Sequence, residues 1–248
     1  MSFALAAAAF APGLAIGSFL NVVAARVPLK RSIVSPGSAC MSCGHELGWY
    51  ENIPVVSWLA LRGKCKGCGD RIGAVYPAVE LLTALLIAAS FLAFGWSGMS
   101  FVAAFFCATL VAVSATDLSH RIVPNVVVLP AAVIVLVAMT VLEPSAEWAL
   151  GAFGASLFLF LAALAYPKGM GMGDVKLALL LGAMLGRHVP VALMLGMIAA
   201  LVPSIVLLVR HGKAARKMGI PFAPFLSLGG LAALFFGGEL LDAYLNLF

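Results

Sequence analysis

Charged side chains are scarce in this chain of 248 residues, because Lys, Arg, Asp and Glu together make up only 10% of it. Hydrophobic residues make up 63%, and the mean hydropathy is +1.11. Soluble globular domains carry about 25% charged residues, so this composition excludes a soluble globule. It is typical of an all-α polytopic membrane protein, which crosses the bilayer several times.

Several catalytic and nucleotide-binding motifs are also absent. The sequence has no Gly-x-Ser-x-Gly, no His-Glu-x-x-His, no Walker sequence and no dinucleotide fingerprint. The two histidines His120 and His188 have no Ser or Cys nucleophile motif nearby. The formal net charge of +5 could suggest nucleic acid, but the basic residues fall in short loops between apolar segments. We therefore expect no nucleic-acid partner.

Apolar segments of about 20 residues, long enough to cross a bilayer, recur along the chain. The first has small residues typical of a signal-peptide cleavage site, but no basic residue precedes it, so we expect a retained helix. The sixth is short and contains glycine, and it could be tilted or partly re-entrant. About eight transmembrane helices are predicted, at residues 3–25, 77–95, 99–116, 124–142, 147–166, 174–187, 189–209 and 222–246.

The distribution of Lys and Arg predicts the orientation of these helices. With the N-terminus outside, all of the 15 basic residues except Arg187 fall in cytoplasmic loops. The same alternation puts two aspartates on the cytoplasmic side. Asp117 closes the apolar run 101–116, and Asp174 begins the sixth segment. A carboxylate inside a membrane costs about 2.5–3.5 kcal/mol on insertion scales, so both residues are functional candidates.

Each aspartate alone has an ordinary structural explanation. Asp117 could be held by Arg121 at a helix end, and Asp174 could cap the sixth helix. Together they form a candidate aspartic protease pair, in which two close carboxylates share one proton and act as base and acid. The glycines around Asp174 would let the chain approach closely there; they are Gly169, Gly171 and Gly173.

Residues 26–76 form a polar, basic insertion between the first two helices, so we divide the chain into 1–25, 26–76 and 77–248. Two Cys-x-x-Cys-Gly hooks, Cys40/Cys43 and Cys65/Cys68, predict one tetrahedral structural zinc site. A pair of disulfides is disfavoured in the cytoplasm, and a redox motif would not need a duplicate. We interpret His45 as a solvated loop residue and Cys107 as a small buried one.

Two other classes of function remain open on the residues alone. An ion- or proton-coupled transporter could use paired acids, although no internal repeat is visible and the acids lie at helix ends. A membrane scaffold could use the zinc module to bind a partner, but it would not need the two acids. Asn21 and Glu80 could form hydrogen bonds between helices or line an active cavity, and we favour the first interpretation.

These motifs together resemble the bacterial type IV prepilin peptidases, the leader peptidase/N-methyltransferase family. The resemblance rests on motifs that occur in order along the chain: Gly17-Ser-Phe-Leu-Asn21, the two cysteine hooks, Tyr76-Pro-Ala-Val-Glu80, Asp117 with Ile122-Val-Pro-Asn125, Gly171-Met-Gly173-Asp174-Val-Lys176 and Ile220-Pro-Phe-Ala-Pro-Phe. Val75, Asn125 and Ala223 depart from residues that are common in the family.

The resemblance implies an aspartic endopeptidase of the bacterial inner membrane with Asp117 and Asp174 as catalytic residues. It implies that Gly171, Gly173 and Lys176 support the active site, and that the four cysteines bind zinc. The implied substrates are prepilins or pseudopilins, which have a basic leader and an apolar helix lying among membrane lipids. It also implies S-adenosylmethionine as methyl donor for the new N-terminus, with no residues assigned. We expect one or more of the inside acids to read the leader; these are Glu46, Glu51, Asp70 and Glu80.

Overall fold

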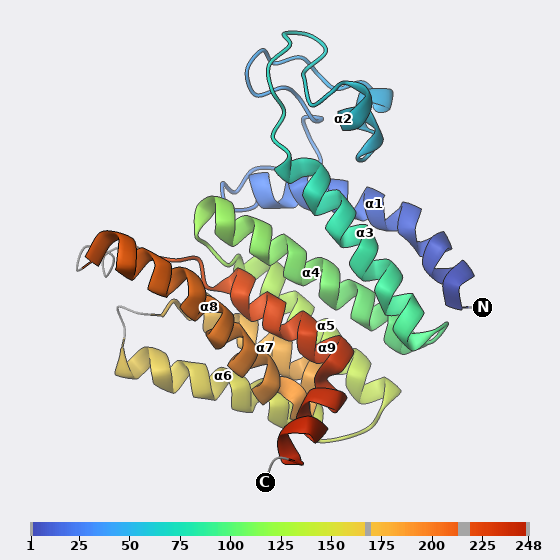
Figure 1. Ribbon diagram of the computed structural model, residues 1–248. Coiled ribbons are helices and arrows are strands. Elements are labelled where there is room, and N and C mark those ends of the chain that lie inside the picture. The colour runs from blue at the N-terminus through green and yellow to red at the C-terminus, as the bar shows by residue number, and fades with distance from the viewer. Residues whose placement is uncertain (1, 167–169, 213–218, 247–248) are drawn as a thin grey trace. The chain divides into compact units, whose positions relative to one another are not determined.

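The computed structural model describes residues 2–166, 170–212 and 219–246 (Figure 1). Within these ranges the chain is helical and has no strands, only two isolated β-bridges. The long helices are α1 (Ser2–Arg26), α3 (Val75–Phe94), α4 (Gly98–His120), α5 (Asn125–Leu142), α6 (Glu147–Ala165), α7 (Met172–Leu185), α8 (Val189–His211) and α9 (Ala223–Leu245). This confirms the predicted all-α membrane fold. Each of the eight predicted helices has a counterpart among the described residues.

Among these residues, seven apolar stretches are long enough to cross a bilayer. The number is seven because Met172–Arg210 counts as one stretch of 39 residues that contains α7, the short 3-10 helix η2 (Gly186–His188) and most of α8. The chain turns at Gly186, whose φ of 51° is in the left-handed region that favours glycine. With 14 residues, α7 is about 21 Å long, shorter than a hydrocarbon core of about 30 Å. The sixth helix is therefore short, as predicted.

The chain divides into two compact units, residues 1–119 and 120–248. In the first unit, α1 packs closely against α3 at two glycines. A Cβ atom on Gly13 would lie 2.7 Å from Cα of Ala84, and one on Gly17 would lie 2.6 Å from Cα of Glu80. Small residues at such crossings are typical of membrane helix pairs. One face of α4 completes this unit through two buried clusters; these contain Leu20, Val79, Val111 and Ala112, and Ile87, Phe91 and Ala104.

In the second unit, α7 packs against α5, α6 and α9. Close contact with α6 depends on Gly151 and Gly182, since a Cβ on Gly182 would lie 2.1 Å from the Gly151 carbonyl oxygen. Helices α8 and α9 also approach closely at a glycine, because a Cβ on Gly229 would lie 2.1 Å from the carbonyl oxygen of Ala192. Nearly every residue of α7 from Asp174 onward is buried. The helix that begins beside Asp174 is thus the core of this unit.

Candidate active site and metal centre

The two cysteine hooks meet in the insertion between α1 and α3. The Sγ atoms of Cys40 and Cys68 lie 3.9 Å apart, as do those of Cys43 and Cys65, and all four lie within 4.8 Å of one another. In a tetrahedral site with Zn–S bonds of about 2.3 Å, the sulfur atoms are roughly 3.8 Å apart. The four cysteines are free thiols, not disulfides. The cluster therefore fits the predicted zinc-binding insertion.

The backbone of the two hooks is nearly identical. In the first, Gly44 N–H donates to the Cys40 carbonyl, and in the second Gly69 N–H donates to that of Cys65. Both glycines are left-handed, with φ of 72° and 74°. Each hook is closed by one β-bridge, Ala39 with Glu46 and Lys64 with Arg71. The glycine after each Cys-x-x-Cys is therefore required by the turn.

The amides of the first hook also favour the thiolate that a metal requires. Hydrogen bonds from the backbone N–H groups of Cys43 and Ser42 lower the pKa of Cys40 to about 6. A thiolate is the form in which cysteine binds metal. The backbone of the first hook thus favours the thiolate form of Cys40.

A buried glutamate, Glu51, braces the hooks. It lies in the 3-10 helix η1 (Trp49–Asn52), and its Oε2 accepts hydrogen bonds from Gly48 N–H and from His45 Nε2, each at 3.0 Å. Lys66 Nζ lies 3.6 Å from its Oε1. The Gly48 amide, helped by His45, lowers the pKa of Glu51. Our interpretation of His45 as a solvated loop residue is wrong, because it pairs with a carboxylate that no sequence motif marks.

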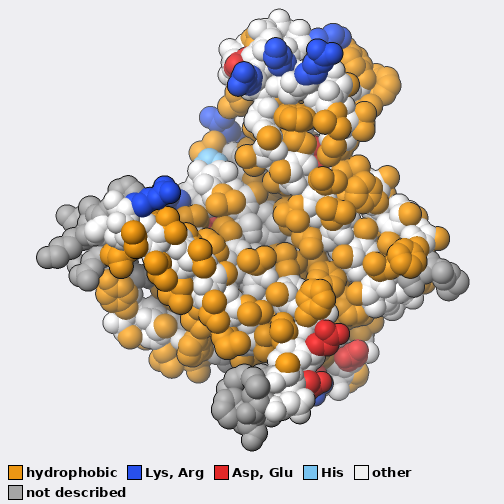
Figure 2. Space-filling model, in the orientation of Figure 1, with side chains coloured by type: hydrophobic (Ala, Val, Ile, Leu, Met, Phe, Trp, Pro, Cys, Tyr) orange, Lys and Arg blue, Asp and Glu red, His pale blue; other side chains and the backbone are white. Residues whose placement is uncertain are grey.

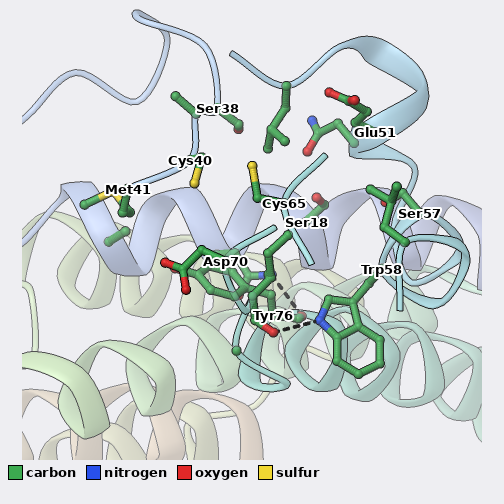
Figure 3. A pocket seen from close by; sticks show the side chains of 18 of the residues that line it. Ser18, Ser38, Cys40, Met41, Glu51, Ser57, Trp58, Cys65, Asp70 and Tyr76 are labelled. Carbon is green, nitrogen blue, oxygen red and sulfur yellow. Dashed lines mark hydrogen bonds between the residues drawn. The ribbon is translucent and has the colours of Figure 1, made fainter. Parts of the chain in front are cut away.

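Three polar contacts lie where the insertion meets the membrane helices: one joins the insertion to α3, one joins α1 to α3, and one lies within the insertion. Glu80 Oε2 in α3 accepts a hydrogen bond of 2.7 Å from Val55 N–H, at the start of the short helix α2 (Val56–Ala60). Asn21 Nδ2 in α1 donates to the carbonyl of Tyr76 at 3.0 Å, and Trp58 Nε1 donates to that of Ile72 at 3.0 Å. Asn21, Ile72 and Glu80 line a cavity of about 430 Å³ together with Trp58 and Tyr76, which are labelled in Figure 3. The structure gives Asn21 and Glu80 the structural contacts that we favoured.

Asp117 lies in the last turn of α4, in the first unit, and is buried. The predicted apolar helix ends at 116, but α4 continues to His120, so the carboxylate projects from regular helix. Cys107 lies ten residues earlier in the same helix. It is fully buried against Ser90, with the Oγ and Sγ atoms 3.8 Å apart, as predicted for a small core residue.

Asp174 lies in the first turn of α7, in the second unit, and is also buried. Helix α7 begins after Gly171, which has extended backbone and makes no side-chain cap. Asp174 is the third residue of the helix, so the explanation that it caps the helix is wrong. A Cβ on Gly171 would lie 3.6 Å from Oδ2 of Asp174, which shows that the carboxylate turns back toward this glycine.

The other supporting residues lie around the first turn of α7. A Cβ on Gly173 would lie only 2.7 Å from Cβ of Val123, so Gly173 lets α7 approach the segment before α5. Lys176 Nζ donates a hydrogen bond of 2.8 Å to Asn125 Oδ1 at the start of α5. This contact was not predicted, although Asn125 was singled out as a departure from the family. Gly169 lies outside the described residues. Because Asp117 and Asp174 belong to different units, their convergence stays a prediction.

We expect Gly173→Ala to displace Asp174, because the added methyl group would overlap Val123. The matched control is Gly171→Ala, where the nearest atom would be 3.6 Å away and φ is −83°. Thermal unfolding in detergent should show a loss of about 1–3 kcal/mol for Gly173→Ala and a much smaller change for Gly171→Ala. Equal stability of the two variants would contradict the close contact.

The helices and the four-cysteine insertion define a multi-pass membrane protein with a small metal-binding module between its first two membrane helices. A family model described as the bacterial Peptidase A24 N-terminal domain matches residues 12–94. A second, described as the type IV leader peptidase family, matches residues 104–205. The chain is also similar over nearly its whole length to curated proteins named prepilin leader peptidase/N-methyltransferase.

The protein of this name from Bacillus subtilis is 37% identical over 243 residues, which cover 95% of this chain and 96% of the relative. The one from Pseudomonas aeruginosa is 36% identical over 267 aligned residues, covering 94% and 91%. The one from Burkholderia pseudomallei is 35% identical over 259, covering 91% and 83%. No solved structure matches the chain. The chain belongs to the type IV leader peptidase family, as its motifs predicted, and nothing in these comparisons supports a transporter.

Proposed function

We propose that the chain cleaves the basic leader peptide from prepilins or pseudopilins at the cytoplasmic membrane face, with Asp117 and Asp174 as the catalytic pair. The observation that carries the proposal is which acids are buried. Among the described residues these are Glu51, Glu80, Asp117 and Asp174. The first two hold the metal-binding module, so the two aspartates at the ends of membrane helices are the candidates for catalysis.

The chemistry follows from two carboxylates that share one proton. The ionised carboxylate takes a proton from water as the oxygen attacks the scissile carbonyl, and the protonated one gives its proton to the leaving amide nitrogen. Close like charges raise the pKa of one member of such a pair, so both forms coexist near neutral pH. The pair titrates as a unit. Burial in helix ends would keep both groups away from bulk solvent.

The residues around Asp174 have supporting roles in this proposal. Gly173 allows α7 to approach Val123, and Gly171 leaves room beside the Asp174 carboxylate. Lys176 is held by Asn125 at 2.8 Å, and this bond connects the first turns of α7 and α5. A fixed first turn would hold the carboxylate in one orientation, which catalysis by positioned groups requires.

We propose that Zn²⁺ is held by Cys40, Cys43, Cys65 and Cys68, one ion per chain. Four thiolates fill the coordination shell, so the ion would stabilise the insertion and leave no open position for substrate. The same protein would transfer a methyl group from S-adenosylmethionine to the newly exposed N-terminal amine, as the names of its relatives indicate. No residues are assigned to that step.

The proposed orientation puts the N-terminus outside, and the module and both aspartates in the cytoplasm, in the inner membrane of a bacterium. It rests on the Lys and Arg distribution. A basic leader would then find few acidic side chains on the cytoplasmic side of the protein. Glu51 and Glu80 are buried and already hydrogen bonded, which leaves the exposed Glu46 and Asp70 to attract a basic leader.

The proposal is tested by adding a full-length prepilin to the purified protein in lipid bilayers. Mass spectrometry should show loss of the leader and, when S-adenosylmethionine is present, a methylated N-terminus. The same vesicles serve for measurements of ion and proton flux. Flux without cleavage would contradict the peptidase function and favour the transporter.

A further inference from the structure

The metal-binding module exposes a set of large apolar side chains on one side. They come from η1, the loop after it and α2, and we call them the Trp49 face: Trp49, Ile53, Val56 and Leu59. Trp49 is 82% exposed, and Leu59 is 61% exposed. Several large exposed apolar side chains within eleven residues of a small polar module are typical of an interaction site. These residues take no part in the cysteine cluster.

The depth of α2 along α3 indicates what covers this face. Val55 N–H, at the start of α2, bonds to Glu80, the sixth residue of α3. Five residues correspond to about 7.5 Å along a helix. The bond therefore holds the start of α2 close to the first turns of α3. Ser57 of α2 and Ser18, in the interior of α1, line the same cavity, which agrees with this depth (Figures 1 and 3).

The anchoring of α2 is rigid. Val55 has φ of 61°, a left-handed conformation that is unfavourable for a β-branched residue and costs about 1–3 kcal/mol. The hydrogen bond to buried Glu80 holds it there, and the Trp58 ring packs against Gly63 and donates to Ile72. The position of the Trp49 face relative to α3 is therefore set by the fold.

The start of α3 also exposes apolar side chains. The outer side of α3 exposes Leu81 and Leu82 within its first two turns. Figure 2 shows hydrophobic side chains extending from the module onto the helices below it, while basic side chains gather on another part of the module. Trp and Tyr are enriched at this level of a bilayer, where apolar rings meet headgroups.

The charge of the module fits an anionic bilayer surface. The exposed basic residues of the two hooks and the segment between them are Arg62, Lys64, Lys66 and Arg71. Glu51, the acid nearest to Trp49 in the chain, is buried, and Glu46 and Asp70 are the exposed acids of the same region. Basic residues near a membrane attract anionic lipids by about 1 kcal/mol each.

We propose that the occupant of the Trp49 face is the lipid bilayer itself. Trp49, Ile53, Val56 and Leu59 enter the boundary between headgroups and acyl chains, and the basic residues contact anionic headgroups, as in interfacial helices that lie on a membrane. The module is then a membrane-seated element and not a domain that projects freely into water. The inference does not depend on the catalytic role of the aspartates.

Brominated lipids, which quench tryptophan from within the acyl region, test the proposal. Full-length protein in lipid nanodiscs is compared with Trp49→Phe, so that the difference in emission reports Trp49 alone. We expect most of this difference signal to be lost in brominated nanodiscs and little of it to be lost to acrylamide in water. The double variant Val56→Ser/Leu59→Ser, with unchanged zinc content, should lower the quenching of Trp49 by lipid at least twofold.

The other outcomes overturn the proposal. Strong acrylamide quenching with none from lipid would mean that the face is in water. Protection from acrylamide that appears only after a prepilin is added would mean that the face binds the substrate helix. Zinc content and thermal unfolding of each variant show whether the module is still folded, so loss of quenching by unfolding is recognised. Leader cleavage is measured on the same samples. If lipid quenches Trp49 of the wild type but no cleavage occurs, the result contradicts the peptidase function and leaves the lipid contact supported.

Discussion

Replacing either Asp117 or Asp174 by asparagine will lower the rate of leader cleavage by about 10²–10⁴-fold, the usual contribution of a positioned general acid or base. Asparagine keeps the shape of the side chain but can neither accept a proton from water nor give one to the amide. Because the two carboxylates act as a unit, the double variant should be no slower than about the worse of the single variants. The measurement is single-turnover cleavage of a prepilin in bilayers.

The matched control is Asp242→Asn, which changes an exposed acid near the end of α9. It should cleave at the wild-type rate. Methylation of a prepilin that is already cleaved separates chemistry from folding, since it should persist in Asp117→Asn and Asp174→Asn. Full cleavage by either single variant would remove that residue from the proposed pair, and loss of methylation as well would indicate a general structural defect.

Replacing Cys65 by serine will remove the metal from the module and unfold it. Structural zinc sites in small peptides bind with an apparent free energy of about 10–16 kcal/mol, which is largely free energy of folding. Cys65 is the buried member of the cluster, so its loss leaves three thiolates and an open ligand position. We expect close to one zinc ion per chain in the wild type, much less in the variant, and rapid hydrogen exchange across the insertion.

Cys107→Ser provides the control, because Cys107 is buried in α4 and belongs to no cluster. It should keep the full zinc content. Acid should also release the metal, since protons compete with it for the thiolates. A Cys65→Ser protein that retained stoichiometric zinc would show that other ligands hold the ion.

The sequence predicted the features that depend on composition and spacing. Apolar length fixes where membrane helices lie, and the spacing of Cys40, Cys43, Cys65 and Cys68 fixes a tetrahedral cluster, so both were predictable. Glu51 was not recognised as a brace, because its role depends on a fold that brings His45, Gly48 and Lys66 around it. Asp174 does not occupy the cap position that we considered as its alternative role, because α7 starts two residues earlier than expected, at Met172.

Contacts between segments that are distant in the chain could not be predicted from the sequence either. The glycines near Asp174 predicted close approach, but only the structure identifies Val123 as the neighbour of Gly173. The polar pair Lys176 and Asn125 joins residues that are 51 positions apart, and no periodicity marks such a pair. Glu80 was noticed as an acid near a membrane surface, yet its partner is a backbone amide, which has no signature in sequence.

The burial of α7 limits the routes open to an incoming polypeptide. Since α5, α6 and α9 all contact this helix, a substrate helix that entered between any two of them to reach Asp174 would have to separate them. The scissile bond must come to the carboxylate over the amino end of α7, or along whatever flank these three neighbours leave uncovered.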